Sequence, residues 1–210
     1  MGGRAVVLAT RSAGKLRELR AMFESAGIAL EDLGSAGLAG EDPAEDGLEV
    51  HETFEENARA KARWFAARLP GRIVIADDSG LEVTALGGVP GVRSKRWSGS
   101  AANGAALDAD NNAALQRALA GKTDRTARYV CVVVCVDGPR EWVARGECAG
   151  RILERPEGTE GFGYDPYFFS EALSKPFGVV SREEKARVSH RGSAFRALLA
   201  QWERARSGVA

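Results

Sequence analysis

Hydrophobic and polar residues follow two different periods along this chain. Short runs rich in β-branched apolar residues are typical of buried strands, and apolar residues spaced three and four apart are typical of helices. The first half of the chain alternates between the two patterns. We expect strands over residues 4–10, 28–34 and 71–83, the last of them breaking at two aspartates. We expect helices over residues 13–27, 54–69 and 108–121.

The second half places two long apolar runs next to each other. Residues 126–153 contain these runs on either side of Asp137-Gly138, a dipeptide that favours a tight hairpin turn. A final helical region, residues 181–205, begins with the capping pattern of Ser181 followed three residues later by Glu184. The order β-α-β-α-β followed by adjacent strands predicts an α/β fold with a mixed β-sheet and flanking helices. No internal repeat or linker divides the chain, so we expect residues 1–210 to form a single domain.

Composition narrows the class of protein. The 210 residues are 44% hydrophobic, which is enough to build one large domain or two closely joined lobes. Lysine plus arginine (29) balances aspartate plus glutamate (29), so the chain has no overall basic charge for nucleic acid. The longest apolar run near the N-terminus, AVVLA, is too short for a signal peptide or a membrane span. We therefore expect a cytoplasmic protein that binds neither nucleic acid nor membrane.

The chain contains three cysteines, an odd number, and no C-x-x-C pair. We interpret them as reduced, buried thiols of an intracellular protein.

The segment LATRSAGKLREL, residues 8–19, joins a strand end to a helix start and looks like a phosphate-binding P-loop. That motif requires a glycine where this chain has Ala9, and a hydroxyl residue where it has Leu16. The P-loop interpretation therefore fails. The free N–H groups and the positive dipole end of the helix would still suit an anion, although any strand-to-helix connection offers this geometry.

Two adjacent carboxylates, Asp77 and Asp78, end a buried apolar run. Neighbouring residues of a strand point to opposite faces, so we expect one aspartate to face a ligand and the other to brace it. A carboxylate among phosphates is a natural Mg²⁺ ligand, and it can accept a proton from water. A simple turn cap explains the pair equally well. Ser79 stands where a D-x-D phosphatase motif would need its second aspartate, which disfavours that class of enzyme.

The segment GFGYDPYF combines glycines with aromatic rings. Glycines let a backbone approach a ligand closely, Phe162 and Tyr164 offer faces for stacking on a base, and Asp165 can accept from ring N–H groups. An aromatic turn at the edge of the core is the alternative. Further along, His190 and Arg191 either start the last helix or contact a ligand. A basic pair opposes the dipole at a helix start, which favours the ligand.

Six segments occur together in an order and spacing that resemble those of the inosine triphosphate pyrophosphatase family. The segments are LATRSAGKLREL, TFEENARAKA, ADDSGLEV, GGVPGVRSKRWSG, GTEGFGYDPYF and REEKARVSHRG. The resemblance runs from about Val6 to Leu199, nearly the whole chain. Each segment alone is a weak signal, but six in register are specific for this family.

The resemblance implies hydrolysis of the non-standard purine nucleotides dITP, ITP and XTP to the monophosphate and pyrophosphate, with Mg²⁺ as cofactor. It also implies an elongated mixed β-sheet with flanking helices, two lobes around a central nucleotide cleft, and a homodimer. This is an ITPase-like, anticodon-binding-like α/β fold. Lysines gathered from separate segments would supply the positive charge that a triphosphate requires.

The functional residues of the family transfer onto this chain position by position. The phosphate loop falls on residues 10–15, with Ser12 where the family has asparagine. The general base falls on Asp78, which the resemblance also makes a metal ligand together with Glu45 in the acidic loop before the second helix. The implied substrate contacts are Thr10, Arg11, Ser12, Ala13, Gly14, Lys15, Lys61, Ser79, Phe162, Gly163, Tyr164, Asp165, Lys185, His190 and Arg191.

Two other functions stay open on the sequence alone. One is a Maf-like pyrophosphatase acting on modified pyrimidine nucleotides, against which residues 162–165 and 189–191 argue. The other is a non-catalytic nucleotide sensor. Ser12 in place of the family's asparagine leaves the sensor open, although the aspartate pair and the lysines argue against it.

Overall fold

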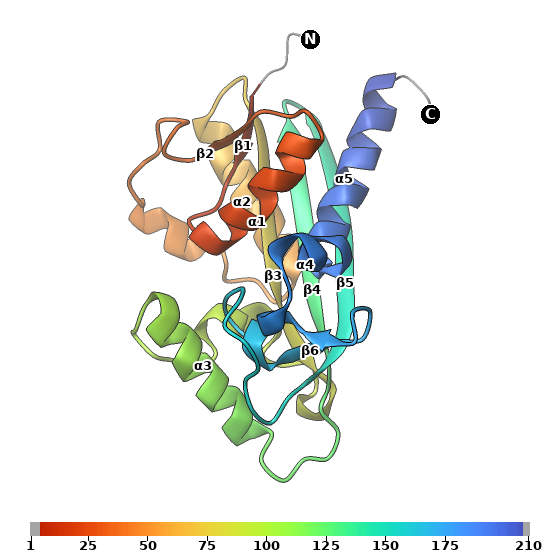
Figure 1. Cartoon of the computed structure of the whole chain (residues 1–210). Helices are drawn as coiled ribbons and strands as arrows, with labels where there is room; N and C mark the ends of the chain where they lie inside the picture. Colours follow the sequence, from red (N-terminus) through yellow and green to blue (C-terminus); the bar gives the residue numbers. More distant parts are fainter. Residues whose placement is uncertain (1–4, 208–210) are drawn as a thin grey trace. The chain divides into compact units, whose positions relative to one another are not determined.

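The computed structural model describes residues 5–207, and Figure 1 follows the chain through them. The chain folds into two compact units. Unit 1 comprises the residues up to Asp78, residues 131–146 and the residues from Ala194 onward. Unit 2 comprises residues 79–130 and 147–193.

Strands and helices alternate in the first half, and strands predominate after the third helix. The strands are β1 (Val6–Leu8), β2 (Leu30–Asp32), β3 (Ile73–Val83), β4 (Thr126–Asp137), β5 (Arg140–Ile152), β6 (Phe168–Ser170) and β7 (Lys175–Pro176). The helices are α1 (Ala13–Ser25), α2 (Phe54–Arg68), α3 (Gly104–Ala118), α4 (Arg182–Val188) and α5 (His190–Ser207). Short 3₁₀ turns lie at Pro43–Gly47, Thr84–Leu86, Gly91–Arg96, Asp165–Tyr167 and Phe177–Val179.

The strands form a seven-stranded mixed sheet in the order β2-β1-β3-β4-β5-β6-β7. β1 pairs in parallel with β2 and β3, whereas β6 pairs antiparallel with β5 and β7. The long strands β3, β4 and β5 each carry the chain from one unit into the other. The predicted α/β fold with a mixed sheet and flanking helices is confirmed.

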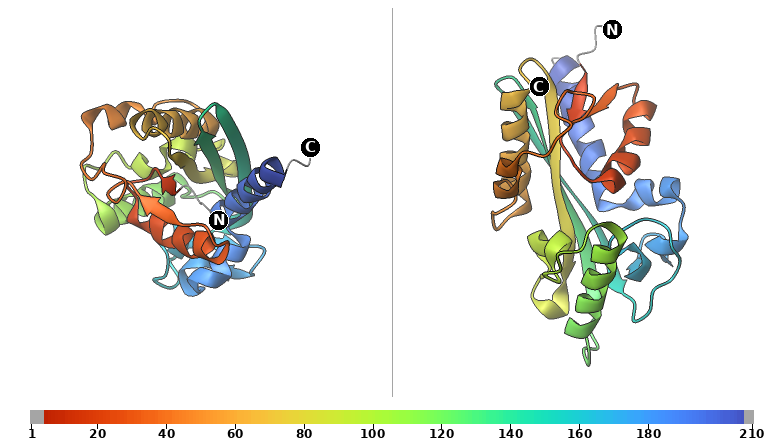
Figure 2. Two further views of the ribbon diagram at one scale, coloured as in Figure 1. Left: turned by 90° about the horizontal axis from the view of Figure 1, so that it is seen from above. Right: turned by 90° about the vertical axis from the view of Figure 1, so that its left-hand side faces the viewer.

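The core of unit 1 has a layer on each face of β1 and β3, because successive strand residues point to opposite faces. Val6 and Leu8 of β1 pack in one cluster with apolar side chains of α1 and α5. Val7 and Ala9 pack in another cluster with apolar side chains of α2. Figure 2 shows the same arrangement, with α2 on one side of β3 and with α1 and α5 on the other.

Aromatic side chains build the core of unit 2. The ring of Tyr129 on β4 packs against Phe168 with centroids 4.6 Å apart, and Phe168 packs against Phe177 at 5.1 Å. Leu115 of α3 and Leu119, the C-cap of that helix, belong to the same cluster. The glycine-rich aromatic segment, residues 161–168, is therefore anchored in this packed core.

Three boundaries differ from the prediction. β3 does not break at its two aspartates but continues to Val83, because Leu81 and Val83 are buried in the core of unit 2. α3 begins at Gly104 rather than at Asp108, whose carboxylate binds another segment instead of capping the helix. The first predicted strand is shorter, and its first residue, Arg4, lies outside the described residues.

Within residues 5–207, no helix is both long enough and apolar enough to cross a membrane.

Candidate functional site

The segment between β1 and α1 forms the predicted phosphate loop in unit 1. Thr10 Oγ1 accepts the N–H of Ser12, and Ser12 Oγ accepts the N–H of Lys15 at 3.3 Å, so Ser12 is the N-cap of α1. Ala13 and Gly14 lie in the first turn, where N–H groups lack intrahelical acceptors. No acidic side chain occupies this turn. The start of α1 therefore suits an anion such as a phosphate.

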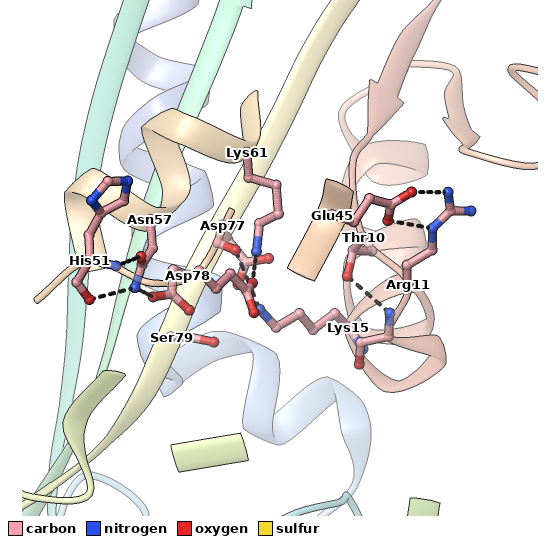
Figure 3. A network of polar contacts seen from close by, with 12 residues as sticks. Thr10, Arg11, Lys15, Glu45, His51, Asn57, Lys61, Asp77, Asp78 and Ser79 are labelled. Carbon is pink, nitrogen blue, oxygen red and sulfur yellow. Dashed lines mark hydrogen bonds and ion pairs between the residues drawn. The ribbon is translucent and has the colours of Figure 1, made fainter. Parts of the chain in front are cut away.

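Two lysines from separate segments meet the aspartates of β3, as Figure 3 shows. Lys15 Nζ lies 2.9 Å from Asp77 Oδ2. Lys61 on α2 forms an ion pair with Glu49. Burial alone would lower the pKa of Lys61, but the negative charges of Glu49, Asp77 and Asp78 raise it above its ordinary value. Two ammonium groups are thus gathered in unit 1 beside the carboxylates of Glu49, Asp77 and Asp78.

Asp77 and Asp78 have different surroundings, as strand geometry predicts. Asp77 continues the face of β3 that packs with α1 and α5, and Asp78 continues the face that packs with α2. Burial raises the pKa of Asp78; Lys61 and Lys15 act in the opposite direction, and Glu49 adds to the rise. A buried carboxylate with a raised pKa beside lysines is a candidate for proton transfer.

Asn57 on α2 holds Asp78 in place. Its Nδ2 donates to Asp78 Oδ2 at 2.9 Å and to the backbone carbonyl of His51, while its Oδ1 accepts the N–H of His51 at 2.9 Å (Figure 3). The side chain is completely buried. Sequence reasoning did not select Asn57, although it lies in the TFEENARAKA segment that supports the resemblance.

Arg11 and Glu45 bind each other. Nε and Nη2 of Arg11 donate to the two carboxylate oxygens of Glu45 at 3.0 and 2.7 Å. The same guanidinium donates to the carbonyls of Leu38, Ala39 and Gly40. These bonds hold the acidic loop against the start of α1, and those from Arg11 hold the pKa of Glu45 below its ordinary value. The roles of Arg11 as a substrate contact and Glu45 as a metal ligand stay predictions.

A metal ion in unit 1 would rest on few protein ligands. Among residues 5–207, no group of three or more histidines, cysteines and acidic residues is placed to hold one. Mg²⁺ keeps several waters and is commonly bound by one or two carboxylates together with substrate phosphates, so a pair suffices. Both loop glutamates are ion-paired, Glu49 with Lys61 and Glu45 with Arg11. Glu49 differs in that its charge acts on Asp78 and its partner Lys61 is also beside Asp78, so Glu49 is a second candidate ligand next to the predicted Glu45.

The predicted base-binding segment forms a tight turn in unit 2. Asp165 Oδ2 accepts the backbone N–H of Phe162 at 2.8 Å and a hydrogen bond from Lys185 Nζ at 2.5 Å. Position 161 requires glycine, because a Cβ on Gly161 would lie 2.1 Å from the same oxygen. Lys185 Nζ also lies 5.1 Å from the centroid of the Phe162 ring. The Asp165 carboxylate thus braces the turn, and Lys185 neutralises that carboxylate.

His190 and Arg191 begin α5 and are nearly completely buried. The His190 ring stacks on that of Tyr129 with centroids 4.5 Å apart and an interplanar angle of 10°. Arg191 Nη2 donates to the hydroxyl of Ser79 at 2.9 Å, and its Cζ lies 5.7 Å from the centroid of the Phe162 ring. Both residues start the helix, as the simpler interpretation expected, and both also reach the aromatic turn or the core behind it.

The predicted site residues fall into two groups. Unit 1 contains Thr10, Arg11, Ser12, Ala13, Gly14, Lys15, Glu45, Lys61 and Asp78. Unit 2 contains Ser79, Phe162, Gly163, Tyr164, Asp165, Lys185, His190 and Arg191. The structure adds contacts that the sequence did not predict, from Asn57 and Glu49 in the first group and from Tyr129 in the second. A helical asparagine, a loop glutamate and a strand tyrosine carry no local signal of their own; only their partners reveal them.

Comparison with known proteins decides the family. A sequence model described as the Ham1 family matches residues 6–201. The chain belongs to the Ham1 family. Among Ham1-type relatives, the dITP/XTP pyrophosphatase of Acidobacterium capsulatum is 48% identical over 199 residues, covering 92% of this chain and 96% of that protein. The dITP/XTP pyrophosphatase of Ralstonia nicotianae is 46% identical over 199 residues, covering 93% and 95%. The resemblance read from the six segments is confirmed.

Solved structures of similar proteins share the fold described above. The Ham1 protein of Staphylococcus aureus matches with a TM-score of 0.79 at 34% identity, covering 95% of this chain and 98% of that one. The nucleoside-triphosphatase / dITP/XTP pyrophosphatase of Mycobacterium abscessus matches with a TM-score of 0.69 at 38% identity, covering 93% and 98%. The mixed-sheet α/β architecture is thus that of the Ham1 family.

Proposed function

We propose that this chain is an Mg²⁺-dependent pyrophosphatase that converts dITP, ITP and XTP to the monophosphate and pyrophosphate. The observation that carries the proposal is the buried Asp78, held by Asn57 and surrounded by the charges of Lys15 and Lys61. Relatives named dITP/XTP pyrophosphatase at 48% and 46% identity support the same activity. Removing these nucleotides from the pool keeps them out of DNA and RNA.

Unit 1 provides the groups that a triphosphate needs. The N–H groups of Ala13 and Gly14 and the dipole of α1 attract phosphate oxygens. Lys15 and Lys61 carry ammonium groups that carboxylates hold in place, so their positions are set before the substrate arrives. Preorganised positive charge of this kind stabilises the negative charge that develops when the phosphoanhydride breaks.

Asp78 acts on the attacking water as a general base. Its raised pKa makes it a better proton acceptor than an exposed aspartate, and the hydrogen bond from Asn57 fixes its orientation. The water attacks the α-phosphorus, its proton passes to Asp78, and pyrophosphate leaves. Asp78 and Glu49 would hold Mg²⁺, which, when bound, neutralises phosphate oxygens and acidifies a nearby water.

Unit 2 provides the groups that hold the purine. The Phe162 ring offers a face to the base, while the Asp165 carboxylate is engaged in the turn. The N–H groups of Phe162 and Gly163 already donate to carboxylates, so the next backbone donor along the turn is that of Tyr164. This donor and Arg191 suit a 6-oxo purine. Adenine would leave such donors unpaired, at a cost of about 1–3 kcal/mol each.

One assay tests the proposed function against its alternatives. The protein is incubated with Mg²⁺ and, separately, dITP, XTP, GTP, ATP and modified pyrimidine triphosphates, and the products are identified. We expect rapid release of pyrophosphate from dITP and XTP. Preferential use of modified pyrimidine nucleotides would favour a Maf-like enzyme, and binding without turnover would favour a nucleotide sensor. Slow phosphate release from every nucleotide would contradict the proposal.

The role of Asp78 has its own test. Asp78→Asn keeps the shape of the side chain and removes its charge, so turnover of dITP should be abolished while substrate binding is largely retained. Retained turnover, or loss of binding together with turnover, would contradict this role.

Three further expectations go with the proposed enzyme. We predict a homodimer, a single functional domain made of both units, and a cytoplasmic location. Light scattering of the purified protein tests the first of these directly.

A further inference from the structure

Helix α3 holds both backbone polar groups of Gly163. Asp108 Oδ2 accepts the N–H of Gly163 at 2.8 Å, and Asn112 Nδ2 donates to the Gly163 carbonyl at 2.9 Å. The two side chains are four residues apart and so share one face of the helix. Asn112 Nδ2 also donates to the backbone carbonyl of Asp108 at 2.8 Å. Asp108 and Asn112, here called the glycine clamp, therefore fix the residue between Phe162 and Tyr164.

The glycine clamp acts at the point of the turn that has the least support of its own. Gly163 has a φ of 63°, in the left-handed region, and it has no side chain to anchor it. Its neighbours are held separately: the N–H of Phe162 by Asp165, and the hydroxyl of Tyr164 by the carbonyl of Ser94 at 2.8 Å. Without the clamp, the backbone could rotate at Gly163.

Residues other than these two provide the apolar contacts of α3. Aspartate and asparagine are poor residues for a helix interior, because their side chains compete for backbone hydrogen bonds. Asp108 lies past the first turn of α3, and Leu115 and the C-cap residue Leu119 belong to the core of unit 2. Burying Asn112 is also unfavourable unless it is hydrogen-bonded. The hydrogen bonds of Asp108 and Asn112 therefore stabilise the turn at Gly163.

We propose that Asp108 and Asn112 are positioning residues that set the preference for 6-oxo purines. This inference rests on the proposed function, in which Phe162 stacks on the base and the Tyr164 N–H donates to its 6-oxo group. A rotation at Gly163 would move that ring and that donor relative to each other. Recognition of dITP requires the Phe162 ring and the Tyr164 N–H in the correct relative position, whereas dATP accepts no hydrogen bond from that N–H at its 6-amino group. Loss of the glycine clamp should therefore weaken the binding of dITP and reduce the preference for dITP over dATP.

Steady-state kinetics of clamp variants test the proposal. Asp108→Ala removes the acceptor of the Gly163 N–H, and Asn112→Ala removes the donor to its carbonyl. Each should raise KM for dITP about tenfold with kcat nearly unchanged, and lower the ratio of kcat/KM for dITP over dATP. Asp108→Asn retains an oxygen that can accept the N–H, so it should recover most of the wild-type KM.

The matched control lies on the same helix. Asp110 is exposed and accepts from the hydroxyl of Ser100 at 2.5 Å, not from the turn. Asp110→Asn should keep the wild-type KM and discrimination. Hydrogen exchange of the Gly163 amide, measured without substrate, should be faster in Asp108→Ala than in Asp110→Asn.

Distinct results overturn the inference and the proposed function. Wild-type KM and discrimination in Asn112→Ala and in Asp108→Ala, despite faster exchange at Gly163, would reduce the clamp to a structural contact. A loss of kcat at unchanged KM would also overturn it. If Asp108→Ala does not fold, Asn112→Ala and Asp108→Asn still decide. Failure of the wild-type protein to hydrolyse dITP would instead contradict the proposed function, and this specificity role with it.

Discussion

Asn57 donates a 2.9 Å hydrogen bond to Asp78, and both side chains are buried. The same amide binds the N–H and the carbonyl of His51, two residues after Glu49. One asparagine therefore joins the proposed general base on β3 to the loop that carries the proposed metal carboxylate. The orientation of Asp78 depends on α2 as much as on its own strand.

We expect Asn57→Leu to lower turnover of dITP by about 100-fold with a smaller change in KM. Leucine has a similar size but cannot hydrogen-bond, so the buried Asp78 carboxylate loses a donor and the His51 backbone loses its partner. The free energy of unfolding should fall by about 1–3 kcal/mol. Steady-state kinetics and urea unfolding measure the two effects.

Glu56→Gln is the control for that substitution. Glu56 is one residue away, and its carboxylate accepts from the Thr53 hydroxyl at the start of α2. Its turnover should stay close to wild type. An unchanged kcat in Asn57→Leu, or an equal loss in Glu56→Gln, would contradict the positioning role of Asn57.

We expect Glu49→Gln to raise the Mg²⁺ concentration for half-maximal activity by about tenfold or more. Glu49 pairs with Lys61, and the charges of Glu49 and Asp78 both act on that lysine, so we expect an ion bound by Asp78 to depend on Glu49 as well. Glu45→Gln should leave this concentration nearly unchanged, because Glu45 binds Arg11, whereas the partner of Glu49 is Lys61, which lies beside Asp78. Activity is titrated with Mg²⁺ at saturating dITP. If Glu45→Gln raised this Mg²⁺ concentration and Glu49→Gln did not, the metal ligand would be Glu45.

The Arg11–Glu45 pair has a separate readout. Both side chains are mostly buried, at 21% and 15% exposure, and the pair is bidentate. A double-mutant cycle of Arg11→Ala and Glu45→Ala should therefore give a coupling free energy of about 1 kcal/mol in urea unfolding. A coupling near zero would show that this pair does not hold the acidic loop.

We expect Ser12→Ala to lower the free energy of unfolding by about 1 kcal/mol, because Ser12 caps α1. Ser12→Asn should preserve stability, since asparagine is an equally good cap. We also expect Ser12→Asn to keep the wild-type KM for dITP, because the short serine already orders this loop. A markedly lower KM in Ser12→Asn would show instead that asparagine makes a substrate contact that Ser12 does not make.

The cysteines should be unreactive in the native protein. All three are buried, and burial raises the pKa of the Cys135 thiol to about 12. Since the thiolate is the reactive form, a thiol reagent at pH 8 should label the native chain very slowly and the urea-unfolded chain at all three positions. Fast labelling of the native protein would contradict this burial.

Most of the fold could be predicted because its signals are local and repeated. The apolar stripe of α2, from Phe54 to Leu69, is buried as its spacing predicts. The two long strands meet at Asp137-Gly138, where Gly138 has a positive φ. The apolar run before Asp77 predicts a strand. No local signal predicts that the strand continues unbroken past Asp78, because the burial of Leu81 and Val83 depends on a core assembled from distant segments.

The partners within the site could not be predicted, because side-chain pairing depends on tertiary contacts. Arg11 and Glu45 are 34 residues apart and bind each other. Lys185 and Asp165 form a buried ion pair in unit 2. Sequence reasoning assigned each of these charges to a ligand, since a charge in a family motif carries no sign of whether a protein group already neutralises it.

The position of bond cleavage tests the central claim most directly. The wild-type protein is incubated with dITP and Mg²⁺ in water enriched in ¹⁸O, and the products are analysed by mass spectrometry. Attack by water on the α-phosphorus predicts one ¹⁸O atom in dIMP and none in pyrophosphate. Label in pyrophosphate, or dIDP and phosphate as the products, would contradict a pyrophosphatase that uses Asp78 to direct water to the α-phosphorus.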